Sequence, residues 1–162
     1  MLSKLLSSQI IIYNCILFFS FCLSVNYFID LEIINYLAYI FFHLTLVYLV
    51  FYFFHFSIIF ISFFYGIFLD IFLIDQISPH LISFLTFVIV FYFTKKYLLN
   101  LSSRKISYTI IIMVLMMFLS ESLLANIIFD FPISFENLGL IFIISIIIFF
   151  PALLFFSKID KL

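Results

Sequence analysis

Residues 36–73 read YLAYIFFHLTLVYLVFYFFHFSIIFISFFYGIFLDIFL, and Asp70 is the only Asp, Glu, Lys or Arg among them. As one α-helix this segment would be about 57 Å long, at about 1.5 Å per residue. The hydrocarbon core of a bilayer is only about 30 Å thick. The segment must therefore cross, turn and cross back, and we predict that the turn lies at residues 52–57, around His55.

The rest of the chain has the same character. Hydrophobic residues make up 68% of its 162 residues and charged residues only 9%, whereas a soluble domain is about a quarter charged. This small number of charges cannot cover a water-exposed surface. We therefore expect the chain to lie in a bilayer, with membrane lipid as a partner. The net charge of −1 gives no reason to expect nucleic acid. The length predicts a single integral membrane domain, residues 1–162.

Together with this helical hairpin, the apolar segments before and after it predict an all-α membrane protein with six transmembrane helices. The predicted spans cover residues 5–29, 33–54, 56–74, 80–93, 106–129 and 138–157. Pro79 suits the first turn of the fourth span, where a missing backbone N–H costs little. We expect that span to end at residues 94–97, and we expect Pro151 to kink the sixth span.

The distribution of charge predicts the orientation. In the six-span arrangement all seven basic residues fall on one side of the membrane: Lys4, Lys95, Lys96, Arg104, Lys105, Lys158 and Lys161. The connections on the other side hold acids and no Lys or Arg: Asp30, Glu32, Asp75, Asp130 and Glu136. The positive-inside rule then places both termini in the cytoplasm.

The basic loop formed by Lys95, Lys96, Arg104 and Lys105 is sufficient to set this orientation. It could also attract anionic lipid, at about 1 kcal/mol per charge, or receive a cytoplasmic partner. Orientation alone is the interpretation we favour.

Two acids fall inside predicted spans, where a charge is costly. Asp70 lies one turn before the end of the third span, and Gly66 lies one turn before Asp70 on the same helix face. A small residue there lets a neighbouring helix approach where the carboxylate needs a partner. Two interpretations of Asp70 remain open: a structural or partner contact facing the bundle, or a carboxylate that reaches headgroup water.

The second acid belongs to a polar patch, Ser120, Glu121, Ser122 and Asn126, in the fifth span. This patch should face protein or a wet cavity. One hypothesis is that the faces of Asp70 and Glu121 meet, with one carboxyl protonated so that it donates a hydrogen bond.

The three histidines carry separate expectations. We interpret His43 as a neutral, hydrogen-bonded interior residue, and we expect His55 and His80 to be solvated at turns.

Motifs of catalysis and ligand binding are missing from the sequence. We find no glycine-rich phosphate loop, no Cys/His metal spacing and no nucleophile elbow. The sequence therefore predicts a protein that is not an enzyme and has no cofactor and no metal.

Residues 66–73 read GIFLDIFL, and an outer turn (74–79) and the apolar run 80–93 follow. This arrangement resembles the rod shape-determining protein MreD family, in which a third span ends in Gly-x-x-x-Asp and a Gly-x-Pro-Leu-Gly-like turn follows. Gly66 and Asp70 match this pattern. Ile74 and Ser78 stand where the family usually has glycine, and Pro79 falls later than the usual proline.

The resemblance implies a non-enzymatic scaffold of the complex that elongates the bacterial cell wall. Such proteins are multi-pass in the cytoplasmic (inner) membrane and associate with the single-span protein MreC. Through it they are linked to the MreB filament and the peptidoglycan synthases that maintain cell shape, and no small-molecule substrate is expected. Their fold resembles the substrate-binding subunits of vitamin transporters. Gly66, Asp70 and Pro79 become partner-contact candidates, and Asp70→Ala should weaken co-purification with an MreC-like partner while insertion stays intact.

Two other functions remain open. A substrate-binding subunit of an energy-coupling vitamin transporter would need an outer cavity of about 300 Å³ or more with convergent polar groups. An accessory subunit of a respiratory or proton-translocating complex would use its intramembrane acids as a relay. Having only two such acids and no intramembrane lysine argues against the relay.

Overall fold

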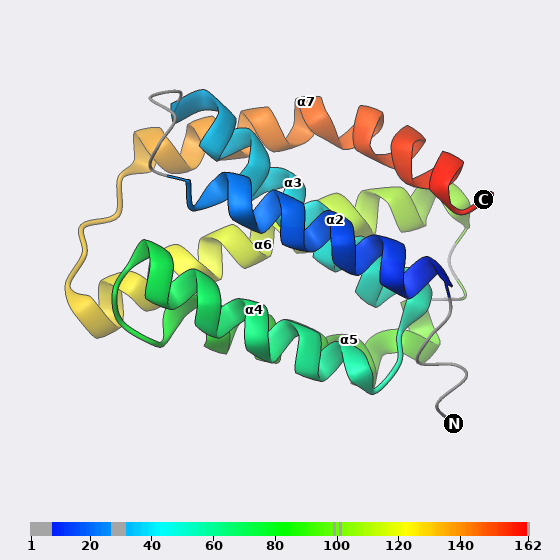
Figure 1. The fold of residues 1–162 in the computed structure, drawn as a ribbon, viewed down its shortest axis with the longest axis horizontal. Helices are drawn as coiled ribbons and strands as arrows, with labels where there is room; N and C mark the ends of the chain where they lie inside the picture. Colours follow the sequence, from blue (N-terminus) through cyan, green and yellow to red (C-terminus); the bar gives the residue numbers. More distant parts are fainter. Residues whose placement is uncertain (1–7, 27–31, 99, 101, 162) are drawn as a thin grey trace.

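The computed structural model describes residues 8–26, 32–98, 100 and 102–161, and the chain is all-helical there (Figure 1). The described helices are α2 (Ser8–Ser24), α3 (Glu32–Phe53), α4 (Ser57–Leu73), α5 (Pro79–Leu98), α6 (Ser103–Phe129) and α7 (Phe135–Ile159). Four of them, α3, α5, α6 and α7, are long and apolar enough to cross a membrane. The other two, α2 and α4, are apolar helices of 17 residues, about 26 Å at 1.5 Å per residue.

Helix α3 forms the centre of the bundle, because it contacts each of the other five described helices. Its second half, from Phe42 to Phe51, is buried at every position. A helix that is hydrophobic all round is typical of such a position. Helix α2 packs chiefly on α3, while α4 and α5 pack chiefly on each other, and all five helices around α3 expose large apolar side chains.

The predicted turn within residues 36–73 is confirmed, since α3 ends at Phe53 and α4 begins at Ser57. His55 lies between them and stabilises the turn. Its carbonyl accepts a hydrogen bond from the amide of Ile58 (2.9 Å), and its Nδ1 accepts one from the amide of Ser57 (3.3 Å).

The fourth helix is longer than the predicted fourth span, which covered residues 80–93. Helix α5 continues to Leu98, and Lys95 and Lys96 lie in its last turn. Cations are favourable at a helix C-terminus, and long side chains let the ammonium group leave the apolar region. The Lys95 Nζ atom lies 4.8 Å from the centroid of the Phe54 ring.

The predicted basic loop is also shorter than expected, because α6 already begins at Ser103. Arg104 and Lys105 belong to its first turn, so the four cations stand on two helix ends. The predicted first span, 5–29, extends beyond Ser8–Ser24 at both ends, and its residues 5–7 and 27–29, like Lys4, lie outside the described residues.

Helix α7 begins three residues earlier than predicted, at Phe135. Ser134 caps it by accepting a hydrogen bond from the amide of Asn137 (3.3 Å), and an acid, Glu136, stands in its first turn. The helix continues through Pro151 to Ile159.

The first and last described helices are tied together at one end of the bundle, which we call the Asp160 end (Figure 1). Tyr13 of α2 donates a hydrogen bond to one Asp160 carboxylate oxygen (2.7 Å), and Tyr48 of α3 donates to the other. Gln9 contacts the Asp160 carbonyl oxygen (3.4 Å). The start of α2 and the end of α7 therefore lie side by side, a contact that the sequence analysis missed.

Candidate functional site

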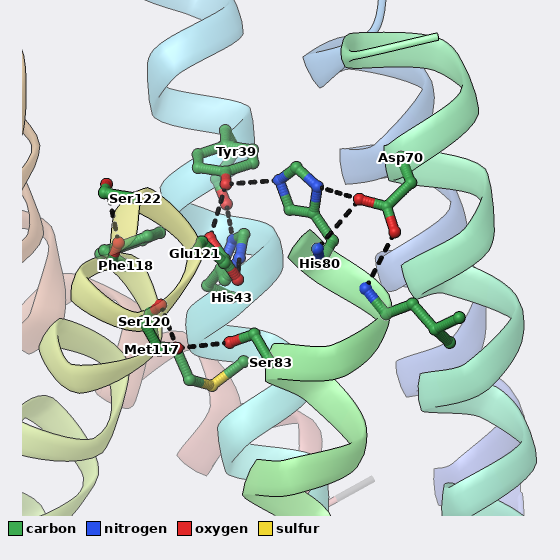
Figure 2. A network of polar contacts seen from close by, with 11 residues as sticks. Tyr39, His43, Asp70, His80, Ser83, Met117, Phe118, Ser120, Glu121 and Ser122 are labelled. Atoms are coloured by element: carbon green, nitrogen blue, oxygen red, sulfur yellow. Dashed lines mark hydrogen bonds and ion pairs between the residues drawn. The ribbon is translucent and has the colours of Figure 1, made fainter. Parts of the chain in front are cut away.

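Five polar side chains from four helices meet in one network (Figure 2). They lie towards the end of the bundle where α4 ends and α5 begins, opposite the Asp160 end (Figure 1), and we call this the Asp70 end. The residues of this polar network are Tyr39 and His43 on α3, Asp70 on α4, His80 on α5 and Glu121 on α6. Asp70 and His43 are 0% exposed, and His80 and Glu121 are each 5% exposed. Buried charges of this kind persist only when they are paired and hydrogen-bonded.

Asp70 caps the start of helix α5 from the neighbouring helix. Its carboxylate accepts hydrogen bonds from the backbone amides of Ser78 (2.9 Å), His80 (2.9 Å) and Leu81 (3.0 Å). Pro79 is the first residue of α5 and has no N–H to satisfy. A helix start leaves several N–H groups free, and an apolar surrounding makes them costly. One carboxylate and one proline together remove that cost.

The His80 ring connects Asp70 to the rest of the network. Its Nδ1 lies 2.8 Å from an Asp70 oxygen, and its Nε2 lies 2.9 Å from the Tyr39 hydroxyl. Tyr39 donates its one hydroxyl proton to Glu121 (2.7 Å), so it accepts from His80. With Asp70 at its other side, both His80 nitrogens then face acceptors, an arrangement that favours the imidazolium form. Asp70 and His80 are then a buried ion pair.

The second pair joins α3 to α6. His43 Nδ1 donates to the Tyr39 carbonyl oxygen one turn earlier (2.8 Å), and its Nε2 lies 3.0 Å from a Glu121 oxygen. A single proton shared between His43 Nε2 and the Glu121 oxygen makes this hydrogen bond, whether the imidazole or the carboxyl carries it. Because carboxyls and imidazoles occur in equal number, the network reaches zero net charge with every hydrogen bond made.

Gly66 makes the contact between α4 and α5 possible. A Cβ atom placed there would lie 2.7 Å from the Leu81 Cα and 3.1 Å from its backbone nitrogen. Real Cβ contacts are essentially never that short, and here the neighbour is backbone. Gly66 therefore sets the distance at which Asp70, one turn further along α4, reaches the amides of α5.

We expect Gly66→Ala to lower the free energy of unfolding by about 1–3 kcal/mol, the usual cost of forcing extra volume into a packed contact. The matched control is Gly139→Ala, because a Cβ there meets nothing within 4 Å. Unfolding of both purified variants in mixed detergent micelles, followed by circular dichroism, measures the difference. Equal stabilities for the two variants would contradict the close approach of α4 and α5.

Two expectations for this end of the bundle are corrected. Asp70 does not reach headgroup water, because it is fully buried under the start of α5. His80 is not solvated, because its ring turns inward between Asp70 and Tyr39. His43 is buried and hydrogen-bonded, as the sequence analysis expected.

The structure brings Asp70 and Glu121 into one network, as the sequence hypothesis required, but His80 and Tyr39 lie between them. Tyr39 was not among the candidates. The signal available for it was its position one turn before His43, on the same face of α3.

The predicted patch on α6 is dispersed around the helix. Ser120 contacts the hydroxyl of Ser83 on α5 (2.6 Å), while Ser122 donates to the Phe118 carbonyl oxygen of its own helix (2.9 Å). Asn126 donates to the carbonyl oxygen of Phe131 in the following connection (2.8 Å). Of the four residues only Glu121 enters the polar network.

The network's polar atoms are directed at one another. Two cavities, of about 790 and 590 Å³, lie elsewhere, the first along α2, α3 and α7 and the second along α5 and α6. Within the part of the chain that the structure describes, no group of three or more His, Cys, Asp or Glu residues could hold a metal ion. The arrangement is suited to fixing the positions of four helices.

Comparison of the chain with family models, with curated proteins and with solved structures found no match.

Proposed function

We propose that this chain is a non-enzymatic membrane scaffold that crosses the bacterial cytoplasmic membrane six times with both termini in the cytoplasm. Its role is that of an MreD-like component of the cell-wall elongation complex, acting on cell shape through an MreC-like single-span partner. The observation that carries the proposal is the closure of the α4–α5 hairpin by Gly66 and Asp70, the two residues that also match the family pattern.

The orientation is supported by the position of the charges in the described bundle. Helices α5 and α7 end, and α6 begins, at the Asp160 end (Figure 1). The described basic residues belong to those helix ends: Lys95, Lys96, Arg104, Lys105, Lys158 and Lys161. Asp75 and Asp130 lie in the connections at the Asp70 end, and Glu136 lies in the first turn of α7 at that end. This distribution favours a cytoplasmic Asp160 end, and Asp160 itself accepts hydrogen bonds from two tyrosine hydroxyls.

A scaffold role is supported by the polar network, because its donors and acceptors form hydrogen bonds with one another. A fully satisfied buried network favours one arrangement of the helices over others. The hairpin end that it fixes then presents a constant surface to another protein. Asp70 supports that surface from beneath, so its effect on a partner is indirect.

The proposal is tested by co-purification from native membranes with a tagged chain. We expect an MreC-like single-span protein to be recovered with the unchanged chain and with Gly139→Ala. We expect roughly tenfold less recovery with Asp70→Ala, because a partner that needs the intact hairpin loses affinity by about 1.4 kcal/mol or more. Failure to recover such a protein with the unchanged chain, or equal recovery with Asp70→Ala, would refute the scaffold assignment.

The vitamin-transporter alternative has one observation in its favour, the cavity of about 790 Å³. Its lining is almost entirely apolar, with Ser20 and Cys15 as the exceptions. A water-soluble vitamin would need convergent polar groups, which this lining does not offer. Native purification with a tightly held small molecule would favour this alternative.

The relay alternative is weakened by where the described network ends. Beyond His43, towards the Asp160 end, α3 continues with a buried and largely apolar segment to Phe51. Thr45 within it donates to the Phe41 carbonyl oxygen of its own helix (2.7 Å). Along this described segment, a proton arriving at His43 meets no further titratable side chain until Tyr48.

A further inference from the structure

An apolar groove of about 590 Å³ runs between α5 and α6. Its lining residues are Ile82, Ser83, Thr86, Phe87, Val90, Phe91, Ile112, Met113, Met116, Met117, Ser120, Leu123 and Leu124. The hydroxyls of Ser83 and Ser120 join the two helices across it, 2.6 Å apart, beside Met117 (Figure 2). Several lining side chains are strongly exposed, Met116 at 59%, so the groove opens to the surroundings of the bundle.

The surroundings of these two helices are hydrocarbon, since both are long and apolar enough to cross a membrane. An apolar groove open to hydrocarbon is filled by whatever chain-like group fits it. Three of the four methionines of the sequence line this groove. Methionine is unbranched and flexible, so it adapts to an irregular apolar occupant such as an acyl chain.

One cation continues the groove towards the Asp160 end. Lys105, Thr109, Ile112 and Met116 are spaced so that they follow one another along a single face of α6. Ile112 and Met116 line the groove, and Lys105 is an exposed residue at the start of the same stripe. A positive charge thus stands about 10 Å beyond Ile112, in line with the groove.

This combination is complementary to one class of molecule, which has a long apolar chain attached to a negative headgroup. We propose that the α5–α6 groove binds an anionic phospholipid, with one acyl chain along the groove and its phosphate at Lys105. The site would retain a lipid from the leaflet at the Asp160 end. It goes beyond the scaffold role and does not depend on it.

A transmembrane helix and a second copy of the chain are the competing occupants. A symmetric dimer through this face would oppose two concave surfaces, which leaves both grooves unfilled. Neither a transmembrane helix nor a second copy of the chain explains a cation in line with the groove. The charge of Lys105 therefore favours an anionic lipid as the occupant.

The test measures lipid binding to the purified, delipidated full chain by native mass spectrometry. The probes are phosphatidylglycerol and phosphatidylcholine with identical acyl chains. We expect phosphatidylglycerol to bind roughly fivefold more tightly, as one cation at a membrane surface provides. Lys105→Gln should remove this preference, whereas Lys161→Gln, another exposed lysine at the same end, should preserve it.

A second variant tests the apolar part of the site. Met116→Trp fills the groove and should lower the binding of both lipids, and circular dichroism reports whether each variant keeps its helix content. The proposal is overturned if the two lipids bind equally to the unchanged chain, or if Lys161→Gln removes the preference as fully as Lys105→Gln. It is also overturned if folded Met116→Trp binds both lipids as the unchanged chain does.

Discussion

Replacing Asp70 with alanine should lower the free energy of unfolding by about 3–5 kcal/mol, the usual cost of removing one partner of a buried ion pair. The substitution leaves the amides of Ser78, His80 and Leu81 without an acceptor and leaves the His80 ring without its carboxylate. Buried donors without partners are costly, and more so where water is excluded. Equilibrium unfolding in mixed detergent micelles measures the loss.

The matched control for Asp70→Ala is Glu136→Ala. Glu136 is an exposed acid in the first turn of α7, where a carboxylate contributes about 0.3–1 kcal/mol through the helix dipole. Similar stabilities of the two variants would mean that Asp70 is a surface acid in solution and that the cap on α5 does not form.

Replacing Glu121 with alanine should have a comparable effect, again about 3–5 kcal/mol. It removes the acceptor of Tyr39 and the partner of His43 at once, and both lie inside the bundle. The informative comparison is Glu121→Gln. A glutamine oxygen still accepts from Tyr39, while its NH₂ group donates to the neutral His43 Nε2, so we expect less than half of the alanine effect.

The same unfolding assay decides between charge and hydrogen bonding at this position. If Glu121→Gln is as destabilising as Glu121→Ala, the network requires the negative charge itself. The account of hydrogen bonds satisfied by one shared proton between His43 and Glu121 would then be wrong.

The helical hairpin at residues 52–57 was predictable because segment length and bilayer thickness leave no alternative. Helix ends were less predictable. Lys95 and Lys96 were expected to end a helix, but a lysine side chain lets its charge leave the apolar region while its backbone stays helical. The start of α7 was missed because the cap at Ser134 was not recognised.

For the candidate site, the sequence indicated individual residues but not their partners. The spacing of Gly66 and Asp70 indicated one helix face, but not that the partners would be backbone amides of the next helix. Of the patch around Glu121, only Glu121 itself joins the network, because consecutive residues on a helix point in different directions. Pairing Glu121 with His43 depends on how α3 and α6 are aligned, and two distant segments of similar apolar composition carry no information about that alignment.

The polar network also explains how so apolar a chain reaches one defined packing. Apolar helix faces in lipid have little preference for one partner over another, whereas hydrogen bonds require particular atoms to meet. The polar network makes such specific hydrogen bonds among α3, α4, α5 and α6 at the Asp70 end. Asp160 makes them among α2, α3 and α7 at the Asp160 end.

The central claim, that the Asp70 carboxylate caps helix α5, is tested most directly by amide hydrogen exchange measured by NMR on the detergent-solubilised chain. We predict that the amides of Ser78, His80 and Leu81 exchange slowly in the unchanged protein. In Asp70→Ala they should exchange at least about a hundredfold faster, the equivalent of about 2.7 kcal/mol, and by a larger factor than the amide of Val88 in the middle of α5, which keeps its own helical hydrogen bond. Fast exchange of the three amides in the unchanged protein, or rates that Asp70→Ala leaves as they were, would contradict the account.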